Sequence, residues 1–166
     1  MRIFIVLMLV FAVVAAMADK AANFSLQDTQ GKKIKLGDVL ASKGCVLIDF
    51  WELSCFSCKQ ALPKYQKIYD KYKDQGLEIL AVSVDSVRTV SNVAPYASGI
   101  GITFPVLLDT NNDVFRNYHV EVMPTCFLLD CNGEIRFTHS GFTSGDEKEI
   151  EEKIVEILKD YAGQKQ

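Results

Sequence analysis

Two nearly continuous apolar runs constrain the fold more than any other feature of this sequence. They cover residues 45–51 (CVLIDFW) and 77–84 (LEILAVSV), and each has the composition of a strand that is buried on both faces. Between them, apolar side chains recur at helical spacing over residues 58–74 (Leu62, Tyr65, Ile68, Tyr69 and Tyr72). Pro63 is expected to kink this helix, and Gly76 lies where it should end. The strand–helix–strand order predicts the α/β class.

Shorter patterns extend this core in both directions. Residues 23–36 alternate around an Asp-Thr-Gln-Gly turn, which predicts a hairpin. A Cys-Asn-Gly turn between residues 126–130 and 134–139 predicts a second hairpin. Helices are expected over residues 37–43, 86–98, 113–118 and 145–161, and a strand over residues 104–108. We therefore predict one domain, a mixed central sheet covered by helices on both faces.

The first 18 residues read as a secretory signal peptide rather than as part of the fold. Arg2 precedes an uncharged apolar stretch, and Ala16-Met17-Ala18 forms a small-x-small cleavage site. An uncleaved membrane anchor is the alternative, although the apolar stretch is short for a bilayer span of about 20 residues. The domain is then residues 19–166, which carry 17 basic and 21 acidic residues. That charge does not favour nucleic acid or an anionic membrane surface as a partner.

The cysteines point to chemistry rather than to a disulfide framework. The chain has five cysteines, an odd number, and it is long enough to bury a core without covalent staples. Cys55 and Cys58 form a CxxC pair where a buried strand should turn into a long helix. Unpaired N–H groups and the positive dipole end at a helix N-terminus stabilise a thiolate. This placement predicts that Cys55 attacks and that Cys58, one turn further on, resolves.

Two other interpretations of the CxxC pair are a zinc site and a permanent structural disulfide. A zinc site needs four ligands, whereas the two histidines, His119 and His139, are twenty residues apart and neither accompanies a second cysteine pair. A permanent structural disulfide between Cys55 and Cys58 stays open, but it does not explain the position at a helix N-terminus.

The motifs around this pair resemble the thioredoxin superfamily, and more closely its exported TlpA/ResA-type thiol–disulfide oxidoreductases, with an AhpC/TSA–Redoxin-type domain. The resemblance covers roughly residues 23–161 and rests on FWELSCFSC, FPVLLD, VEVMPTCFLLDCNGE and a proline eight residues after Cys55. It implies a thioredoxin-like fold with an N-terminal β-hairpin and an inserted helix–strand segment. It also implies a cis bond between Met123 and Pro124, packed against the CxxC pair.

The resemblance carries further roles onto residues of this chain. Asp49 matches a buried carboxylate that moves the proton of the resolving cysteine, and strand alternation lets it point below the CxxC pair. An unpaired buried carboxylate has a raised pKa and serves as a base near neutral pH. The expected client-binding residues are Trp51, Phe56, Ser57, Met123 and Thr125, with client main chain pairing at Met123.

The sequence also departs from the family pattern at three places. Ser54 stands where a tryptophan usually precedes the first cysteine, Phe56-Ser57 replaces the common Gly-Pro, and His119 falls where glycine is frequent. Because the residues between the cysteines tune the redox poise, the direction of electron flow stays open.

The other three cysteines have separate expectations. We predict a structural disulfide between Cys45 and Cys131. Cys45 opens one strand, Cys131 closes the strand after Pro124, and the two strands are antiparallel neighbours in this fold. Cys126, two residues after Pro124, is expected to be a buried unpaired thiol.

The sequence thus predicts an enzyme of thiol–disulfide exchange, exported to the periplasm or held at the outer face of the cytoplasmic membrane. Its partners are thiols and disulfides of exported proteins, with a membrane-spanning thiol reductase as electron donor and with no cofactor or metal. Reduction of clients, for instance during cytochrome c maturation, is the leading expectation, and a disulfide oxidase or isomerase is the alternative. Three further alternatives are a Sco-like copper-delivery protein, a peroxiredoxin and a binding module without redox activity. The CxxC spacing and the lack of a Thr-x-x-Cys motif disfavour the copper protein and the peroxiredoxin, and two intact cysteines argue against the module.

Overall fold

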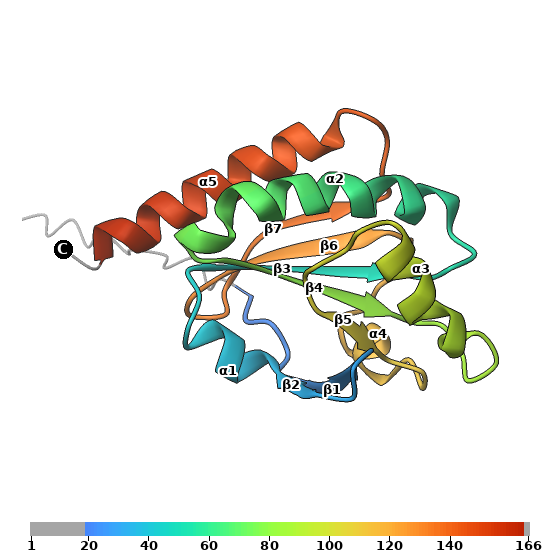
Figure 1. The fold of residues 1–166 in the computed structure, drawn as a ribbon. Coiled ribbons are helices and arrows are strands. Elements are labelled where there is room, and N and C mark those ends of the chain that lie inside the picture. The colour runs from blue at the N-terminus through green and yellow to red at the C-terminus, as the bar shows by residue number, and fades with distance from the viewer. Residues whose placement is uncertain (1–18, 165–166) are drawn as a thin grey trace, which may run out of the picture.

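The structure is a computed structural model that describes residues 19–164, so the signal-peptide prediction lies outside the described residues. A seven-stranded sheet carries helices on both faces (Figure 1). The strands are β1 (Ser25–Asp28), β2 (Lys33–Lys35), β3 (Cys45–Trp51), β4 (Leu77–Ser83), β5 (Val106–Leu108), β6 (Thr125–Asp130) and β7 (Ile135–Ser140). The helices are α1 (Leu36–Leu40), α2 (Phe56–Tyr72), α3 (Val93–Gly99), α4 (Asp113–Asn117) and α5 (Asp146–Gln164), with 3-10 turns η1 (Lys73–Gln75) and η2 (Val90–Asn92).

The sheet is mixed, as the sequence predicts. Its strand order is β2-β1-β5-β4-β3-β6-β7. Strands β3, β4 and β5 are parallel, whereas β6 runs antiparallel to β3. Both predicted hairpins are confirmed, β1 with β2 and β6 with β7, and the second contains an irregularity between Leu128 and Leu129.

Strand β3 is the centre of the molecule, and all seven of its residues are buried. Its side chains alternate between the two faces of the sheet. Leu47 and Trp51 pack into one apolar layer, while Ile48 and Phe50 pack into the other. Burying each such large apolar side chain contributes about 1.5–3 kcal/mol. The alternation leaves Asp49 on the face of Leu47 and Trp51.

The two apolar layers place the helices. Helices α2, α3 and α5 cover the face of Leu47, with Leu62, Val93 and Ile154 among the buried contacts. Helices α1 and α4 cover the opposite face, and Figure 1 shows α2 and α5 together on one side of the sheet with α1 on the other. The CxxC helix therefore packs directly over the face that carries Asp49.

One predicted helix is shorter than expected, and a proline explains why. The sequence predicted a helix over residues 86–98, whereas the structure has η2 followed by α3, which begins at Val93. Pro95 then falls in the first turn of α3, where its missing N–H has no helical acceptor to lose. In a helix starting at Ser86, the same proline would remove a bond to the carbonyl of Ser91. By contrast, Pro63 lies inside α2 without ending it.

The first described residues are attached to the β6–β7 turn. The backbones of Lys20 and Glu134 form an isolated antiparallel β-bridge, and the N–H of Ile135 donates to the carbonyl of Asp19 at 2.9 Å. This turn lies beside Cys45, at the opposite end of β3 from the CxxC pair. Within residues 19–164, no helix combines the length and the apolar character needed to cross a membrane.

Candidate active site

The CxxC pair lies at the point where β3 leads into α2. Cys55 is the N-cap of α2 in an extended conformation, and its sulfur accepts a hydrogen bond from the N–H of Cys58 at 3.2 Å. The two sulfurs form a disulfide. Cys55 is partly exposed, whereas Cys58 is fully buried. A partner can therefore approach only Cys55 directly, and the attacking and resolving roles stay a prediction.

The proline loop lies against this pair although it is far away in the sequence. The Met123–Pro124 peptide bond is cis, as the resemblance implies. The Ser57 hydroxyl lies 3.5 Å from the Met123 carbonyl oxygen and 3.5 Å from the Cys55 sulfur. Ser57 therefore connects the CxxC turn to the loop that the resemblance assigns to client binding.

Two of the residues expected to bind clients have buried side chains. Trp51 is fully buried beneath the site, with its ring 5.9 Å from that of Tyr96. Thr125 is also buried, and its hydroxyl donates to the carbonyl of Val122 at 2.6 Å. Trp51 thus supports the site from below, and the Thr125 side chain holds the proline loop. Neither side chain is accessible to a client in this structure.

Asp49 is buried without a polar partner. It is fully inaccessible, and neither of its carboxylate oxygens has a hydrogen-bond partner. Its neighbours across the strands are Ala81 on β4 and Cys126 on β6, and neither carries a positive charge. Burial raises the pKa of the Asp49 carboxyl well above its ordinary value of 3.8. This carboxyl therefore keeps its proton to a higher pH than an exposed aspartate does.

Cys126 and Tyr65 complete the buried polar group around Asp49. Burial raises the pKa of the Cys126 thiol to about 12, and the Asp49 carboxylate adds to this, whereas a hydrogen bond with Tyr65 lowers it. Cys126 is a free, buried thiol, as predicted. Sequence reasoning did not connect Cys126 or Tyr65 with Asp49. The position of Cys126 two residues after Pro124 was the available signal.

The predicted Cys45–Cys131 disulfide is wrong, because both residues are free thiols in the structure. The register pairs Cys45 with Asp130, so Cys131 lies one residue beyond the end of β6. Cys45 is fully buried in the apolar layer under α5, whereas the Cys131 sulfur lies 3.9 Å from the side-chain oxygen of Gln164. Burial raises the pKa of the Cys45 thiol to about 12.

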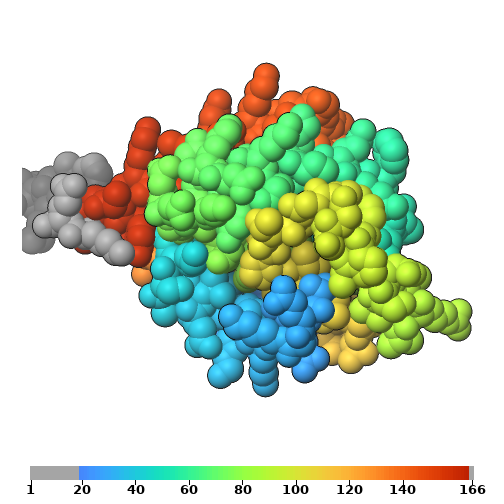
Figure 2. All heavy atoms as spheres, viewed as in Figure 1, coloured from blue at the N-terminus to red at the C-terminus, as the bar shows by residue number. Residues whose placement is uncertain are grey.

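Three large apolar side chains are strongly exposed among the described residues, and all lie in segments at the active-site end of the sheet. Phe56 is 76% exposed, Val122 precedes the proline loop, and Val87 follows β4 in a loop that projects from the surface (Figure 2). Phe56 was expected from the sequence, whereas Val87 and Val122 were not. Single exposed apolar side chains are ordinary on a protein surface.

The residues just after β4 hold the segment that precedes the CxxC pair. The buried Asp85, just after β4, accepts hydrogen bonds from the N–H of Leu53 and the hydroxyl of Ser83, both at 3.0 Å. The residues before Cys55 are thereby attached to the end of the neighbouring strand.

His119 adopts a positive φ of 51° in the segment before the proline loop, which explains why glycine is frequent there in the family.

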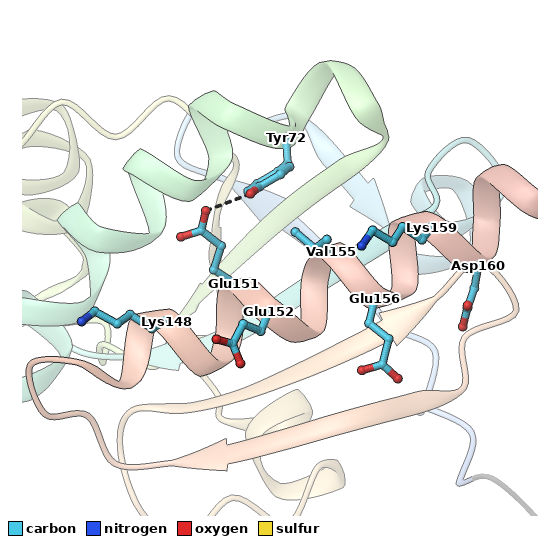
Figure 3. A pocket seen from close by; sticks show the side chains of 8 residues that line it. All are labelled: Tyr72, Lys148, Glu151, Glu152, Val155, Glu156, Lys159 and Asp160. Atoms are coloured by element: carbon cyan, nitrogen blue, oxygen red, sulfur yellow. Dashed lines mark hydrogen bonds between the residues drawn. The ribbon is translucent and has the colours of Figure 1, made fainter.

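A groove on the helical surface lies away from this chemistry. Figure 3 shows it between the end of α2 and α5, where Tyr72 donates a hydrogen bond to Glu151 at 2.9 Å. Helix α2 is about 25 Å long, so the groove is far from Cys55.

Among residues 19–164, no cluster of three or more histidine, cysteine, aspartate or glutamate residues is placed to hold a metal ion. His139 instead pairs with Asp146 at 3.2 Å.

Comparison with known proteins agrees with the geometry. Residues 17–138 match the model of the AhpC/TSA family. The chain is 32% identical to the thiol-disulfide oxidoreductase ResA of Halalkalibacterium halodurans over 148 residues, which cover 89% of this chain and 80% of that protein. ResA of Bacillus subtilis is 40% identical over 115 residues, or 69% of this chain and 62% of that protein.

Solved structures show the same likeness. A Chlorobium tepidum protein assigned as the thiol:disulfide interchange protein DsbE has a TM-score of 0.78 and 33% identity, and the match covers 85% of this chain and 96% of that one. StoA from Bacillus subtilis has a TM-score of 0.64 and 27% identity, over 81% of this chain and 97% of that one. The chain therefore belongs to the AhpC/TSA family, as a ResA-like thiol–disulfide oxidoreductase of the thioredoxin superfamily.

Proposed function

We propose that this enzyme reduces disulfides of exported proteins outside the cytosol, with Cys55 as nucleophile, Cys58 as resolving thiol and Asp49 as proton acceptor. The observation that carries the proposal is the contrast within the CxxC pair. Cys55 is partly exposed at the start of α2, and Cys58 is buried over the face of the sheet that carries Asp49. A client sulfur can therefore meet Cys55 while Cys58 waits behind it.

The reaction then follows in two exchanges. The Cys55 thiolate attacks a client disulfide, forms a mixed disulfide and releases one client sulfur as a thiolate. Cys58 gives its proton to the Asp49 carboxylate, and its thiolate attacks the Cys55 sulfur. This step forms the Cys55–Cys58 disulfide and releases the second client sulfur as a thiolate. Two electrons have passed from the dithiol to the client, whose thiolates take protons from water.

Asp49 suits the proton step because it has no competing partner. Burial raises the pKa of its carboxyl, and neither oxygen is occupied by a hydrogen bond. A carboxyl whose pKa is raised above its ordinary value is a better proton acceptor than an exposed aspartate. Asp49→Asn should therefore slow resolution of the mixed disulfide by about a hundredfold at neutral pH.

The exposed apolar side chains favour a protein client over a small thiol. Phe56 lies between the two cysteines, Val122 lies two residues before Pro124, and both are exposed. In the family's binding mode the client pairs with the Met123 main chain, whose carbonyl oxygen lies 3.5 Å from the Ser57 hydroxyl. Residues 1–18 support an exported location, where a membrane-spanning thiol reductase would regenerate the dithiol. Apocytochromes c, whose cysteines must be reduced before haem attachment, are the proposed client class.

Insulin reduction tests the reaction. The wild-type protein with dithiothreitol should precipitate insulin chains faster than dithiothreitol alone, and Cys55→Ser should abolish this gain. Cys58→Ser should instead accumulate a mixed disulfide that is visible on a non-reducing gel. Equal rates for wild type and Cys55→Ser would refute the proposed reaction.

The direction of electron flow needs its own measurement, because Phe56-Ser57 also suits an oxidase. Ser57 lies close enough to Cys55 to stabilise its thiolate, and a stabilised thiolate makes a couple more oxidising. Equilibration with defined dithiol buffers gives the potential of the Cys55–Cys58 couple. A potential of about −270 mV or lower supports a reductant, whereas one near −120 mV would replace it with an oxidase.

A further inference from the structure

Ser57 lies between two acceptors that belong to different steps of the proposed reaction. Its hydroxyl oxygen is 3.5 Å from the Cys55 sulfur and 3.5 Å from the Met123 carbonyl oxygen. The first acceptor is the nucleophile, and the second is the main-chain group that would pair with a docked client. The distance to the Met123 oxygen is long for an O–H···O hydrogen bond, so this contact does not hold the hydroxyl firmly.

A serine hydroxyl has one proton to donate, so it can serve only one of these acceptors at a time. In the disulfide form, the Cys55 sulfur is a weak acceptor, and the Met123 carbonyl is the stronger one. The same holds in the reduced enzyme while Cys55 is a thiol. A thiolate accepts a hydrogen bond that is about twice as strong, but a hydroxyl that turns to it leaves the Met123 carbonyl without a donor until a client supplies one.

We propose that Ser57 is a positioning residue that couples client docking at the Met123 main chain to stabilisation of the Cys55 thiolate. When client main chain pairs with Met123, a client N–H donates to the Met123 carbonyl in place of Ser57. The Ser57 hydroxyl then rotates and donates to the Cys55 sulfur. The thiolate then has two donors, the Ser57 hydroxyl and the Cys58 N–H at 3.2 Å. This inference rests on the proposed function and adds that a peptide disulfide activates the nucleophile that attacks it.

The local structure allows the Ser57 hydroxyl to rotate at a small cost in free energy. Ser57 lies in the first turn of α2, where rotation of its side chain disturbs no helical hydrogen bond. It is only partly buried, so the hydroxyl has room beside the client surface. Ser54 provides a matched control, because its hydroxyl lies on the other side of Cys55 in sequence and donates to Glu52 instead.

The test compares two disulfides that differ in their backbone. Insulin presents main chain to Met123, whereas hydroxyethyl disulfide has none. The rate of attack by the reduced protein is measured with each disulfide below the pKa of the Cys55 thiol, for wild type, Ser57→Ala, Ser57→Thr and Ser54→Ala. Losing a charge-assisted hydrogen bond lowers the thiolate population about tenfold. Because nucleophilicity rises as the pKa rises, the net loss in rate is roughly three- to fourfold.

We expect Ser57→Ala to show this loss with insulin and little loss with hydroxyethyl disulfide. Ser57→Thr keeps the hydroxyl and should restore the insulin rate, and Ser54→Ala should match wild type with both substrates. An equal loss with both disulfides would overturn the coupling and leave Ser57 as a static neighbour of the thiolate. No loss with either disulfide would remove Ser57 from the mechanism altogether.

Failure of the inference and failure of the proposed function are distinguishable. If wild type reduces insulin no faster than Cys55→Ser, the proposed function fails regardless of Ser57. If wild type is active and Ser57→Ala is equally active with insulin, only the inference fails. Thermal denaturation of each variant confirms that a lost rate does not come from unfolding.

Discussion

Asp49 on β3 and Cys126 on β6 lie directly opposite each other in the antiparallel register, and both face the buried layer beneath the CxxC helix. A carboxyl and a thiol thus share an environment without a compensating cation. Burial raises the pKa of both groups, and the Asp49 carboxylate adds to the rise at Cys126. Asp49 therefore keeps its proton to a higher pH than an exposed aspartate does.

The buried carboxyl makes stability depend on pH in a definite direction. The folded-state pKa of Asp49 is raised above its ordinary value of 3.8, so the folded state binds more protons than the unfolded state above that pH. Its contribution to stability is fully present below pH 3.8 and is lost as pH rises through the folded-state pKa. The loss is about 1.4 kcal/mol per pH unit within that window.

Asp49→Asn should remove this slope. Urea denaturation between pH 4 and 8 should show the variant gaining on wild type as pH rises, whatever offset the buried amide causes. Asp38→Asn, which removes an exposed carboxylate on α1, serves as the charge control and should keep the wild-type slope. Parallel curves for wild type and Asp49→Asn would contradict a raised pKa.

The free thiols should differ sharply in reactivity. The oxidised protein, unfolded without reductant, should titrate with three thiols, from Cys45, Cys126 and Cys131. Under native conditions at pH 8, iodoacetamide should label Cys131 alone, because burial shields the other two and raises their thiol pKa to about 12. Peptide mass spectrometry identifies the labelled residue. A single titratable thiol would instead restore the Cys45–Cys131 disulfide.

The loop before the CxxC pair should depend on Asp85. Asp85→Ala leaves the N–H of Leu53 and the hydroxyl of Ser83 without their acceptor, which should lower the free energy of unfolding by about 1–3 kcal/mol. Hydrogen exchange at the Leu53 amide should also speed up. Asp85→Asn retains one acceptor oxygen and should lose less. Unchanged exchange at Leu53 in Asp85→Ala would show that the loop is held by other contacts.

The entrance to β3 has no room for a side chain at residue 44. A methyl group on Gly44 would overlap the ring of Tyr161 on α5. Gly44→Ala should therefore lower the free energy of unfolding by about 1–3 kcal/mol in urea denaturation. In the background of Tyr161→Ala, the same substitution should cost much less. Gly99→Ala, at a position with open space, is the control, and a similar loss there would discount the clash.

Local sequence patterns predicted the central strand, the direction of Asp49 and the CxxC pair. The nearly continuous apolar run of residues 45–51 predicts a central strand. Side-chain alternation along that strand places Asp49 on the face of the sheet opposite to Ile48 and Phe50. The CxxC pair at the end of that strand predicts an exposed sulfur followed by a buried one. These features depend on neighbours within a few residues, so strand and helix periodicity is enough to read them. Pro124 needed the family resemblance, because its distance from Cys55 in the chain hides their contact.

The tertiary structure decided what depends on register and on contacts between distant segments. A one-residue offset in the β3–β6 register pairs Cys45 with Asp130, and this offset overturned the predicted disulfide. The same register places Cys126 beside Asp49, and the packing of the proline loop brings Met123 to Ser57. Sequence periodicity shows which face a side chain occupies, but only the paired strands decide which partner it meets there.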